Sequence, residues 1–174
     1  VEMIFNKKRD LLIVVGGGSL PPSMYDRPHE DELQPNRDRM EEQVIHYCVA
    51  HGIPIIATCR GMQYINVMFG GKLWYHPKLP VTRTRGMDHQ VWLVKEQRNI
   101  WVNNYHSDCI YEEGLAPCFE PLAIDRENHV VEAYGSDEMK ILALQWHPER
   151  RFETANAYEE TRKIVLDFIQ KHVK

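Results

Sequence analysis

The chain has 174 residues, of which 43% are hydrophobic and 26% are charged, and its formal net charge is -4. This length is enough for one domain with a hydrophobic core, so we predict a single domain over residues 1–174. The mildly acidic balance provides no basic face for a phosphate backbone, so nucleic acid is not an expected partner. No apolar run approaches the roughly 20 residues needed to cross a bilayer, and no signal-peptide pattern opens the chain, which predicts a soluble protein with no membrane partner.

The four cysteines form no C-x-x-C pair and no disulfide-dense pattern. Free thiols in a reducing compartment are the simpler interpretation, so we expect a cytoplasmic protein. The nine histidines are scattered, and none stands at ligand spacing from a cysteine. We therefore expect neither a metal site nor a cofactor.

The chain opens with a pattern that predicts a buried strand and a loop. Residues 11–15 are a continuous aliphatic run, typical of a strand buried on both faces, and three glycines close it at positions 16–18. Residues 19–36 carry four prolines and many polar side chains, so this segment is expected to be a loop.

A helix, a strand and a second helix follow the loop. Apolar positions at helical spacing predict a helix over residues 36–51, in which Arg37 and Glu41 can pair and which Gly52 ends. Residues 53–58 are an apolar, β-branched run that predicts a buried strand, and a helical segment comes directly after it. This order indicates an α/β protein with a mostly parallel, flavodoxin-like sheet flanked by helices.

The rest of the chain predicts further strands and a closing helix. Residues 72–128 contain short alternating stretches that favour hairpin-like or edge strands, and two more strands are expected over 130–134 and 141–145. The last helix is expected from about residue 157, where Asn156 and Glu159 can form a capping-box-like start. One face of this helix is apolar, with Thr161, Ile164, Val165, Phe168 and Ile169.

Cys59 stands between the predicted strand and helix, which is where an α/β protein exposes a nucleophile. A tight strand-to-helix turn needs small residues two places before and after it, and here these are Ala57 and Gly61. The helix N-terminus favours a thiolate, and the amide of Arg60 can donate to a developing oxyanion. The alternative is a buried structural cysteine, which we accept for Cys48, Cys109 and Cys118 but not for Cys59.

A histidine and a carboxylate follow the last predicted strand. Glu149 stands two positions after His147, so the carboxylate can orient the imidazole while the other ring nitrogen faces the thiol. An isolated H-P-E also fits a solvated strand end. Together with the cysteine turn, the pair predicts a Cys-His-Glu triad.

The glycine loop is the third component of the predicted site. Gly17 and Gly18 can direct backbone amides into the same crevice and complete an oxyanion hole with Arg60. A phosphate-binding loop is the weaker alternative, because G-x-x-x-x-G-K-[ST] is absent and the glycines run into prolines.

Four motifs together resemble the class I glutamine amidotransferase-like superfamily: GGGSLPPSMY, IPIIATCRGMQ, VNNYHSD and LALQWHPE. Within it the chain is similar to the γ-glutamyl hydrolase (peptidase C26) type, which includes γ-glutamyl-γ-aminobutyrate hydrolases and γ-glutamyl-CDP-amidate hydrolases. The resemblance implies a triad of Cys59, His147 and Glu149. It also implies that the γ-glutamyl group is held near Gln63 and the 104–107 segment, where Asn104, Tyr105 and His106 are the candidates.

The chain departs from this family at three points, of which the first is Ala57, where a glycine is common. Family members begin with a strand-helix-strand unit before the glycine loop, so we expect residues 1–174 to lack that first unit. The stretch between Leu73 and His89 is short beside the γ-aminobutyrate enzymes and resembles the compact members that act on CDP-amidate.

The expected function is hydrolysis of a γ-glutamyl C–N bond through a γ-glutamyl thioester on Cys59, with release of glutamate and an amine or phosphoramidate. Arg37, Asp38 and His106 are candidates for reading the leaving group, but a solvated first helical turn is the favoured interpretation of Arg37 and Asp38. The expected partner is a small γ-glutamyl substrate, and a homodimer is left open. The alternative is a glutaminase subunit that delivers ammonia to a synthetase partner, and a non-catalytic module is disfavoured by the intact triad.

Overall fold

The computed structural model describes residues 10–25, 33–75 and 86–173. Parts of the predicted 19–36 loop and of the short 73–89 stretch lie outside these residues. The described elements are, in chain order, β1 (Leu12–Val14), the 3-10 helix η1 (Pro22–Met24), α1 (Pro35–His51), β2 (Ile55–Thr58), α2 (Arg60–Met68), β3 (Trp74–Tyr75), β4 (Asp88–Leu93), β5 (Arg98–Asn103), β6 (Asp108–Cys109), the 3-10 helix η2 (Glu112–Gly114), β7 (Glu120–Asp125), β8 (Val130–Ser136), β9 (Ile141–Leu144) and α3 (Ala157–His172).

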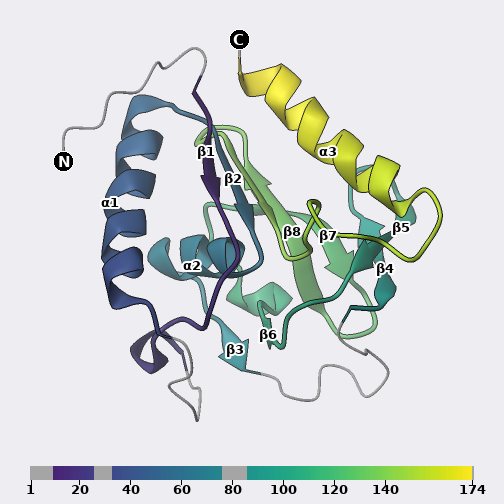
Figure 1. Ribbon diagram of the computed structural model, residues 1–174, viewed down its shortest axis with the longest axis horizontal. Coiled ribbons are helices and arrows are strands. Elements are labelled where there is room, and N and C mark those ends of the chain that lie inside the picture. Colours follow the sequence, from purple (N-terminus) through teal and green to yellow (C-terminus); the bar gives the residue numbers. More distant parts are fainter. Residues whose placement is uncertain (1–9, 26–32, 76–85, 174) are drawn as a thin grey trace.

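Seven of the described strands form one sheet, in the order β1-β2-β9-β8-β7-β4-β5. The first three strands are parallel, and the remaining four extend the sheet by antiparallel pairing. The sheet separates two hydrophobic cores, one under α1 and α2 and the other under α3. Figure 1 shows α1 and α3 on opposite sides of the sheet, so the predicted α/β class with flanking helices is confirmed.

Most predicted elements are confirmed. The helix predicted over residues 36–51 is α1. It ends at Gly52, which has a φ of 65° and donates its N–H to the carbonyls of Cys48 and Val49. Arg37 and Glu41 form the expected pair, at 2.6 Å. The alternating stretches become the antiparallel hairpin of β4 and β5, and β8 and β9 are the two later strands.

Two predictions are wrong at the level of local detail. The first strand is not buried on both faces: β1 is the outermost strand of the sheet that the described residues form, Leu12 and Val14 pack in the core of α1, and Ile13 is 56% exposed. Asn156 makes no side-chain cap to α3, because it adopts a left-handed conformation with a φ of 69°. Thr161 instead donates its hydroxyl to the carbonyl of Ala157 inside the first turn.

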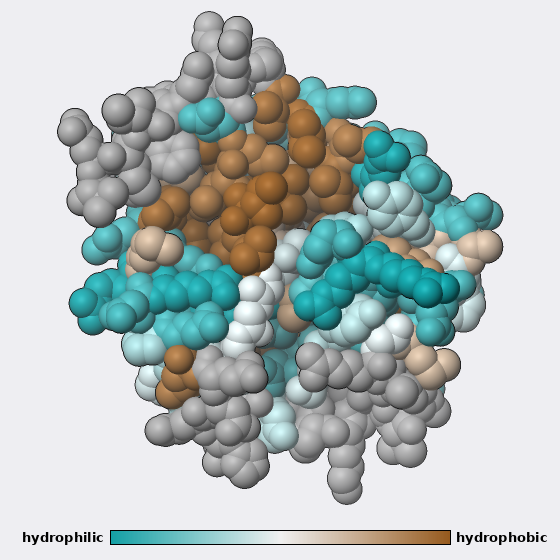
Figure 2. All heavy atoms as spheres, viewed as in Figure 1, coloured by the Kyte–Doolittle hydropathy of each residue, from teal (hydrophilic) through white to brown (hydrophobic). Residues whose placement is uncertain are grey.

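The exposed side of β1 is part of a larger apolar surface. Figure 2 shows hydrophobic residues gathered between α1 and α3, over the β1 edge of the sheet. Ile13 and Val15 are each more than half exposed there. Leu12 and Val14 pack in the core under α1, and Leu11 packs against the core under α3, whereas Ile13 and Val15 stay exposed.

Gly61 allows α2 to start directly against β1. A Cβ atom at this position would overlap the carbonyl oxygen of Val14 and would lie 2.9 Å from its Cγ1 atom. Backbone cannot move aside as a flexible side chain can. The approach of β1 to the first turn of α2 therefore requires glycine, as the small-residue rule for this turn predicts.

We therefore expect Gly61→Ala to lower the free energy of unfolding by about 1–3 kcal/mol, the usual cost of overpacking. Chemical denaturation measures this change. Gln43→Ala, at an exposed position of α1, is the control and should change stability by less than about 0.5 kcal/mol. Equal stabilities of Gly61→Ala and the control would contradict the close packing of β1 on α2.

Candidate active site

Cys59 occupies a strained turn between β2 and α2. Its φ of 51° and ψ of -110° are rare for any residue other than glycine. The surrounding structure fixes this conformation, because Cys59 donates its N–H to the carbonyl of Leu144 (2.7 Å) and its own carbonyl accepts the N–H of Gln63 (3.1 Å). The predicted turn is thus present, and the side chain is 9% exposed.

His147 follows β9 and is held at both its backbone and its ring. The buried Asn103 accepts the His147 N–H (2.9 Å) and donates to the His147 carbonyl (2.8 Å). Nδ1 lies 2.6 Å from a carboxylate oxygen of Glu149. Because a carboxylate only accepts, Nδ1 carries the proton and Nε2 is left as the acceptor that a general base needs.

Cys59, His147 and Glu149 share one hollow with the glycine loop. This hollow has a volume of about 390 Å³, within the usual range for small-ligand sites. Its walls are formed by the loop after β1, the turn at Cys59 and the segment after β9, with contributions from Val15, Gly16, Gly17, Gly18, Cys59, Tyr105, His147, Glu149 and Arg150. The structure therefore brings together the predicted triad, the predicted loop and Tyr105.

Gly16 lies close to both Cys59 and His147. A Cβ atom on Gly16 would lie 2.8 Å from Cε1 of His147 and 3.5 Å from Cβ of Cys59. Sequence reasoning named Gly17 and Gly18 instead, although the signal, three successive glycines, includes Gly16. Any side chain at position 16 would press on the imidazole.

Burial controls the charge of both reactive groups. Burial raises the pKa of Cys59 to about 11, although the Arg60 amide and the Arg150 charge lower it. Burial also lowers the pKa of His147 from 6.5, although Glu149 acts in the opposite direction. The Arg60 amide at the start of α2 thus acts in the expected direction, towards the thiolate, but burial outweighs it. Near neutral pH the site holds a thiol and a neutral imidazole.

Besides Arg60, three predicted binding residues lie outside the lining of the hollow. Gln63 is buried and donates to the carbonyl of Asp108 and to the side chain of Gln145, both at 3.1 Å. Asn104 is 3% exposed, and its carbonyl accepts the N–H of Gly86. These contacts are structural, so any role of Gln63 or Asn104 in substrate binding stays a prediction.

His106, the third of these residues, belongs to a separate buried cluster. Its Nε2 lies 3.6 Å from a carboxylate oxygen of Glu132, and Nε2 of His89 lies 3.4 Å from the same oxygen. Burial alone would raise the pKa of Glu132, but the two histidines hold it well below its ordinary range. Sequence reasoning missed this cluster because β4, β8 and the segment after β5 meet only in the folded sheet.

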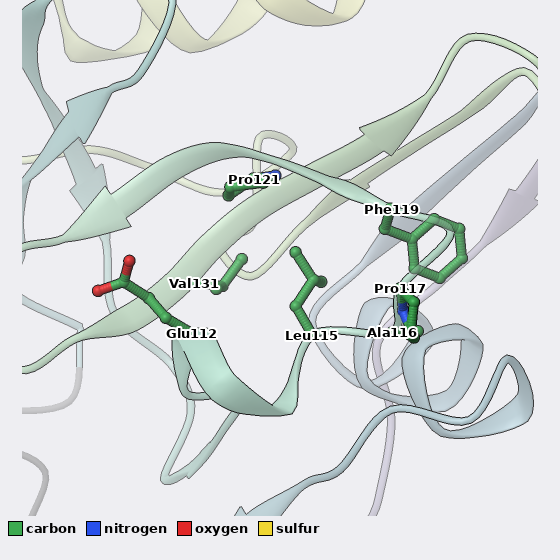
Figure 3. A pocket seen from close by; sticks show the side chains of 7 residues that line it. All are labelled: Glu112, Leu115, Ala116, Pro117, Phe119, Pro121 and Val131. Atoms are coloured by element: carbon green, nitrogen blue, oxygen red, sulfur yellow. The ribbon is translucent and has the colours of Figure 1, made fainter.

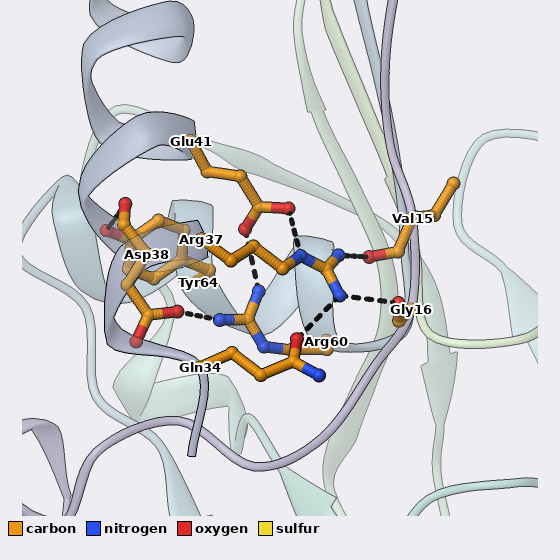
Figure 4. A network of polar contacts seen from close by, with 8 residues as sticks. All are labelled: Val15, Gly16, Gln34, Arg37, Asp38, Glu41, Arg60 and Tyr64. Atoms are coloured by element: carbon orange, nitrogen blue, oxygen red, sulfur yellow. Dashed lines mark hydrogen bonds and ion pairs between the residues drawn. The ribbon is translucent and has the colours of Figure 1, made fainter. Parts of the chain in front are cut away.

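The predicted solvated first turn of α1 is also wrong. Asp38 is 6% exposed and pairs with Arg60, which is 1% exposed. Arg37 reaches across to the glycine loop and donates to the carbonyls of Val15 and Gly16. Figure 4 shows these side chains meeting between α1, α2 and the end of β1.

A second hollow, of about 260 Å³, lies beside η2 and is lined mainly by apolar residues (Figure 3). Glu112 is the one ionisable side chain in its lining, and it points away from the centre. This hollow contains no nucleophile or base, so it does not compete with the Cys59 site.

Two features are absent from the described residues. No group of three or more histidine, cysteine, aspartate or glutamate side chains in them could hold a metal ion. None of the helices in the described ranges is both long and apolar enough to span a membrane.

Comparisons with known proteins define the class of the fold first. A GMP synthase subunit of Thermoplasma acidophilum superposes with a TM-score of 0.62, covering 92% of this chain and 73% of its own, at 20% sequence identity. A glutamine amidotransferase of Thermotoga maritima superposes with a TM-score of 0.59, covering 91% of this chain and 64% of its own, at 18% identity. The fold is therefore that of the class I glutamine amidotransferases.

The family follows from sequence. The Peptidase C26 family model matches residues 5–149, so the chain belongs to the peptidase C26 family, a class of hydrolases of the glutamine amidotransferase type. Protein NtpR of Enterococcus hirae is 32% identical over 162 residues, 80% of this chain and 66% of that protein. The γ-glutamyl-γ-aminobutyrate hydrolase of Escherichia coli is 26% identical over 175 residues, 86% of this chain and 67% of its own length. The chain thus spans about two thirds of the length of these relatives.

The His147–Glu149 contact gives a pH-dependent prediction. Glu149 raises the pKa of His147, so Glu149→Gln should lower that pKa further below 6.5. His147 must be neutral to accept a proton, and activity is lost as the pH falls through its pKa. The acid limb of kcat/KM should therefore move to lower pH in Glu149→Gln, while kcat at pH 7.5 falls by about tenfold or more because the ring is no longer oriented.

Activity profiles between pH 4.5 and 8.5 measure both effects. Glu153→Gln removes an exposed carboxylate nearby and should leave the profile unchanged. An acid limb that stays in place or moves to higher pH in Glu149→Gln would contradict the assigned role of Glu149.

Proposed function

We propose that the protein hydrolyses the γ-glutamyl amide bond of a small γ-glutamyl conjugate, with Cys59 as nucleophile. The observation that carries this proposal is the meeting of three features in one hollow: the strained Cys59 turn, the His147–Glu149 contact at 2.6 Å and the glycine loop. Membership of the peptidase C26 family and similarity to a γ-glutamyl-γ-aminobutyrate hydrolase support it.

The first half of the reaction forms a thioester. His147 Nε2 takes the thiol proton as the sulfur of Cys59 attacks the γ-carbonyl carbon, because the high pKa of the thiol prevents spontaneous ionisation near neutral pH. Backbone amides of the glycine loop and of Arg60 stabilise the oxyanion. When the tetrahedral intermediate collapses, the C–N bond breaks and His147 gives its proton to the leaving nitrogen.

The second half releases glutamate. Water attacks the thioester carbonyl and gives a proton to His147, and the C–S bond breaks. The proton returns to the sulfur, so the thiol and the neutral imidazole are restored. Glu149 keeps Nδ1–H engaged throughout and stabilises the transient imidazolium.

The position and charge of Arg150 support a substrate whose leaving group is negatively charged. Its guanidinium lies 4.4 Å over the Tyr105 ring, and that ring meets the His147 ring edge-on at 5.6 Å. Since His147 protonates the leaving nitrogen, Arg150 stands on the leaving-group side of the hollow. No carboxylate among the described residues forms an ion pair with Arg150, so its charge is available to a carboxylate or phosphoryl group.

The test of the function is glutamate release from three substrates: glutamine, γ-glutamyl-γ-aminobutyrate and a γ-glutamyl phosphoramidate of a nucleotide. We expect the full-length protein to turn over at least one conjugate well above glutamine, and Cys59→Ala to abolish this turnover. Cys118 is exposed and not buried as predicted, so Cys118→Ala is the matched control and should stay active. If folded protein releases no glutamate from any of the three substrates, the proposal is overturned and a glutaminase subunit that needs a synthetase partner is favoured.

Arg150→Gln tests the leaving-group assignment. The measured quantity is the ratio of kcat/KM for γ-glutamyl-γ-aminobutyrate to that for the neutral γ-glutamyl-butylamide. We expect Arg150→Gln to lower this ratio by about tenfold, as for loss of one charge-assisted hydrogen bond near the surface. Arg151→Gln, at the exposed neighbouring position, should leave the ratio unchanged.

Taking the ratio separates recognition from general effects. Arg150 also lowers the pKa values of Cys59 and His147, and losing that effect changes both substrates equally. A uniform loss for both conjugates would contradict the leaving-group role and indicate that Arg150 binds the glutamyl α-carboxylate or only tunes the reactive pair.

A further inference from the structure

A compact ion-pair network lies directly behind the glycine loop. The guanidinium of Arg37 donates to the carbonyls of Val15 (2.6 Å) and Gly16 (3.1 Å), and its Nε donates to Glu41 (2.6 Å). Figure 4 shows Arg37 extending from α1 to the end of β1. One planar side chain therefore hydrogen-bonds to two successive backbone carbonyls at the start of the loop.

Glu41 connects Arg37 to Arg60, which directly follows Cys59. One oxygen of Glu41 accepts from Arg37, and the other accepts from Nη1 of Arg60 at 2.7 Å. Arg60 is 1% exposed and is also paired with Asp38. Two guanidinium groups and two carboxylates thus balance in charge, and each carboxylate is needed because the two cations repel each other.

Peptide geometry gives the network a consequence inside the hollow. The described peptide bonds are all trans, so each backbone N–H points opposite to the preceding carbonyl. Because the Gly16 carbonyl points to Arg37, the Gly17 N–H points away from Arg37. A side chain on Gly17 would overlap Nη1 of Arg37, whereas one on Gly16 would meet His147 and Cys59. The loop is therefore sandwiched between the arginine and the catalytic pair, with the Gly17 amide directed to the catalytic side.

The second amide belongs to Arg60. It lies at the first position of α2, directly after Cys59, and it lowers the pKa of the Cys59 thiol. Its side chain is the one that Glu41 holds. A single carboxylate thus links the side chains that fix both amides.

Resting on the proposed function, we propose that Arg37 and Glu41 are positioning residues for the oxyanion: they hold the amides of Gly17 and Arg60 at a fixed separation. Neither side chain lines the hollow, so neither touches substrate. Their effect is on the transition state, because a preorganised donor stabilises charge that exists only there.

The alternative is a network that only joins α1 to the sheet. The two accounts differ in what they predict for Arg37→Lys, which keeps the charge but cannot form the planar fork to two carbonyls and Glu41. A purely structural network predicts that loss of activity follows loss of stability. A positioning network predicts loss of kcat in protein that remains folded.

The experiment compares Arg37→Gln, Arg37→Lys and Glu41→Gln with two controls on exposed positions of the same helix, Arg39→Gln and Glu42→Gln. For each protein we would measure kcat and KM on the best conjugate of the panel, Tm, and the affinities for glutamate and for a γ-glutamyl aldehyde. The aldehyde forms a hemithioacetal with Cys59. The oxygen of this hemithioacetal occupies the position of the oxyanion.

We expect kcat to fall by about 10- to 100-fold in all three network variants, with KM changed by less than about threefold. Affinity for the aldehyde should fall in parallel with kcat/KM, while affinity for glutamate stays constant. The two controls should behave as wild type. If Arg37→Gln does not fold, Arg37→Lys carries the test because it preserves the charge balance.

Two results would overturn the inference. One is wild-type kcat in folded Arg37→Lys and Glu41→Gln. The other is an equal loss of affinity for the aldehyde and for glutamate. Either result leaves the hydrolase function standing, since wild-type turnover is measured in the same series. Absence of wild-type turnover on every conjugate would instead refute the function, and the positioning role with it.

Discussion

The parallel pairing of β1, β2 and β9 is the constraint on which the site depends. Val14 pairs with Ala57, and Thr58 pairs with Leu144, so the carboxyl ends of the three strands lie at one edge of the sheet. Gly16, Cys59 and His147 each follow one of these strands within three residues. Segments more than 80 residues apart in the chain are thereby brought to a single hollow, as is usual at the carboxyl ends of parallel strands.

The antiparallel half of the sheet supports that edge without contributing a nucleophile. Asn103, at the end of β5, binds the backbone of His147 from both sides, and Tyr105 packs on its ring. Burial on this side lowers the pKa of His147, while burial at the turn raises the pKa of Cys59. These pKa shifts favour a thiol and a neutral imidazole, and under the proposed mechanism charge develops only as the thiol attacks. Preorganised amides gain most from such an arrangement, because they stabilise charge that the resting state lacks.

The sequence predicted those parts of the site that depend on short-range order. Cys59 was found from the strand, the turn and the helix that surround it, and Glu149 from its two-residue spacing to His147. The direction of side chains was harder to predict. Gln63 lies in the first turn of α2, after Cys59, but its side chain donates to Asp108 and Gln145 and not into the hollow. Arg37 and Asp38 have the composition of a solvated helix start, and only the position of α1 against β1 and α2 makes them part of a buried network. Likewise, Leu11 to Val15 has the composition of a central strand, and only strand pairing places β1 at the end of the sheet that the described residues form.

Charge divides the three arginines around the site into two roles. Arg37 and Arg60 are paired with Glu41 and Asp38, so their charges are neutralised within the protein and their contribution is geometric. Arg150 has no such carboxylate partner among the described residues, and it lies on the Tyr105 face beside His147. The arginine pair behind the glycine loop therefore adds no net charge on that side of the hollow. Under the proposed function, Arg150 then supplies the unneutralised positive charge that orients an anionic substrate in the hollow.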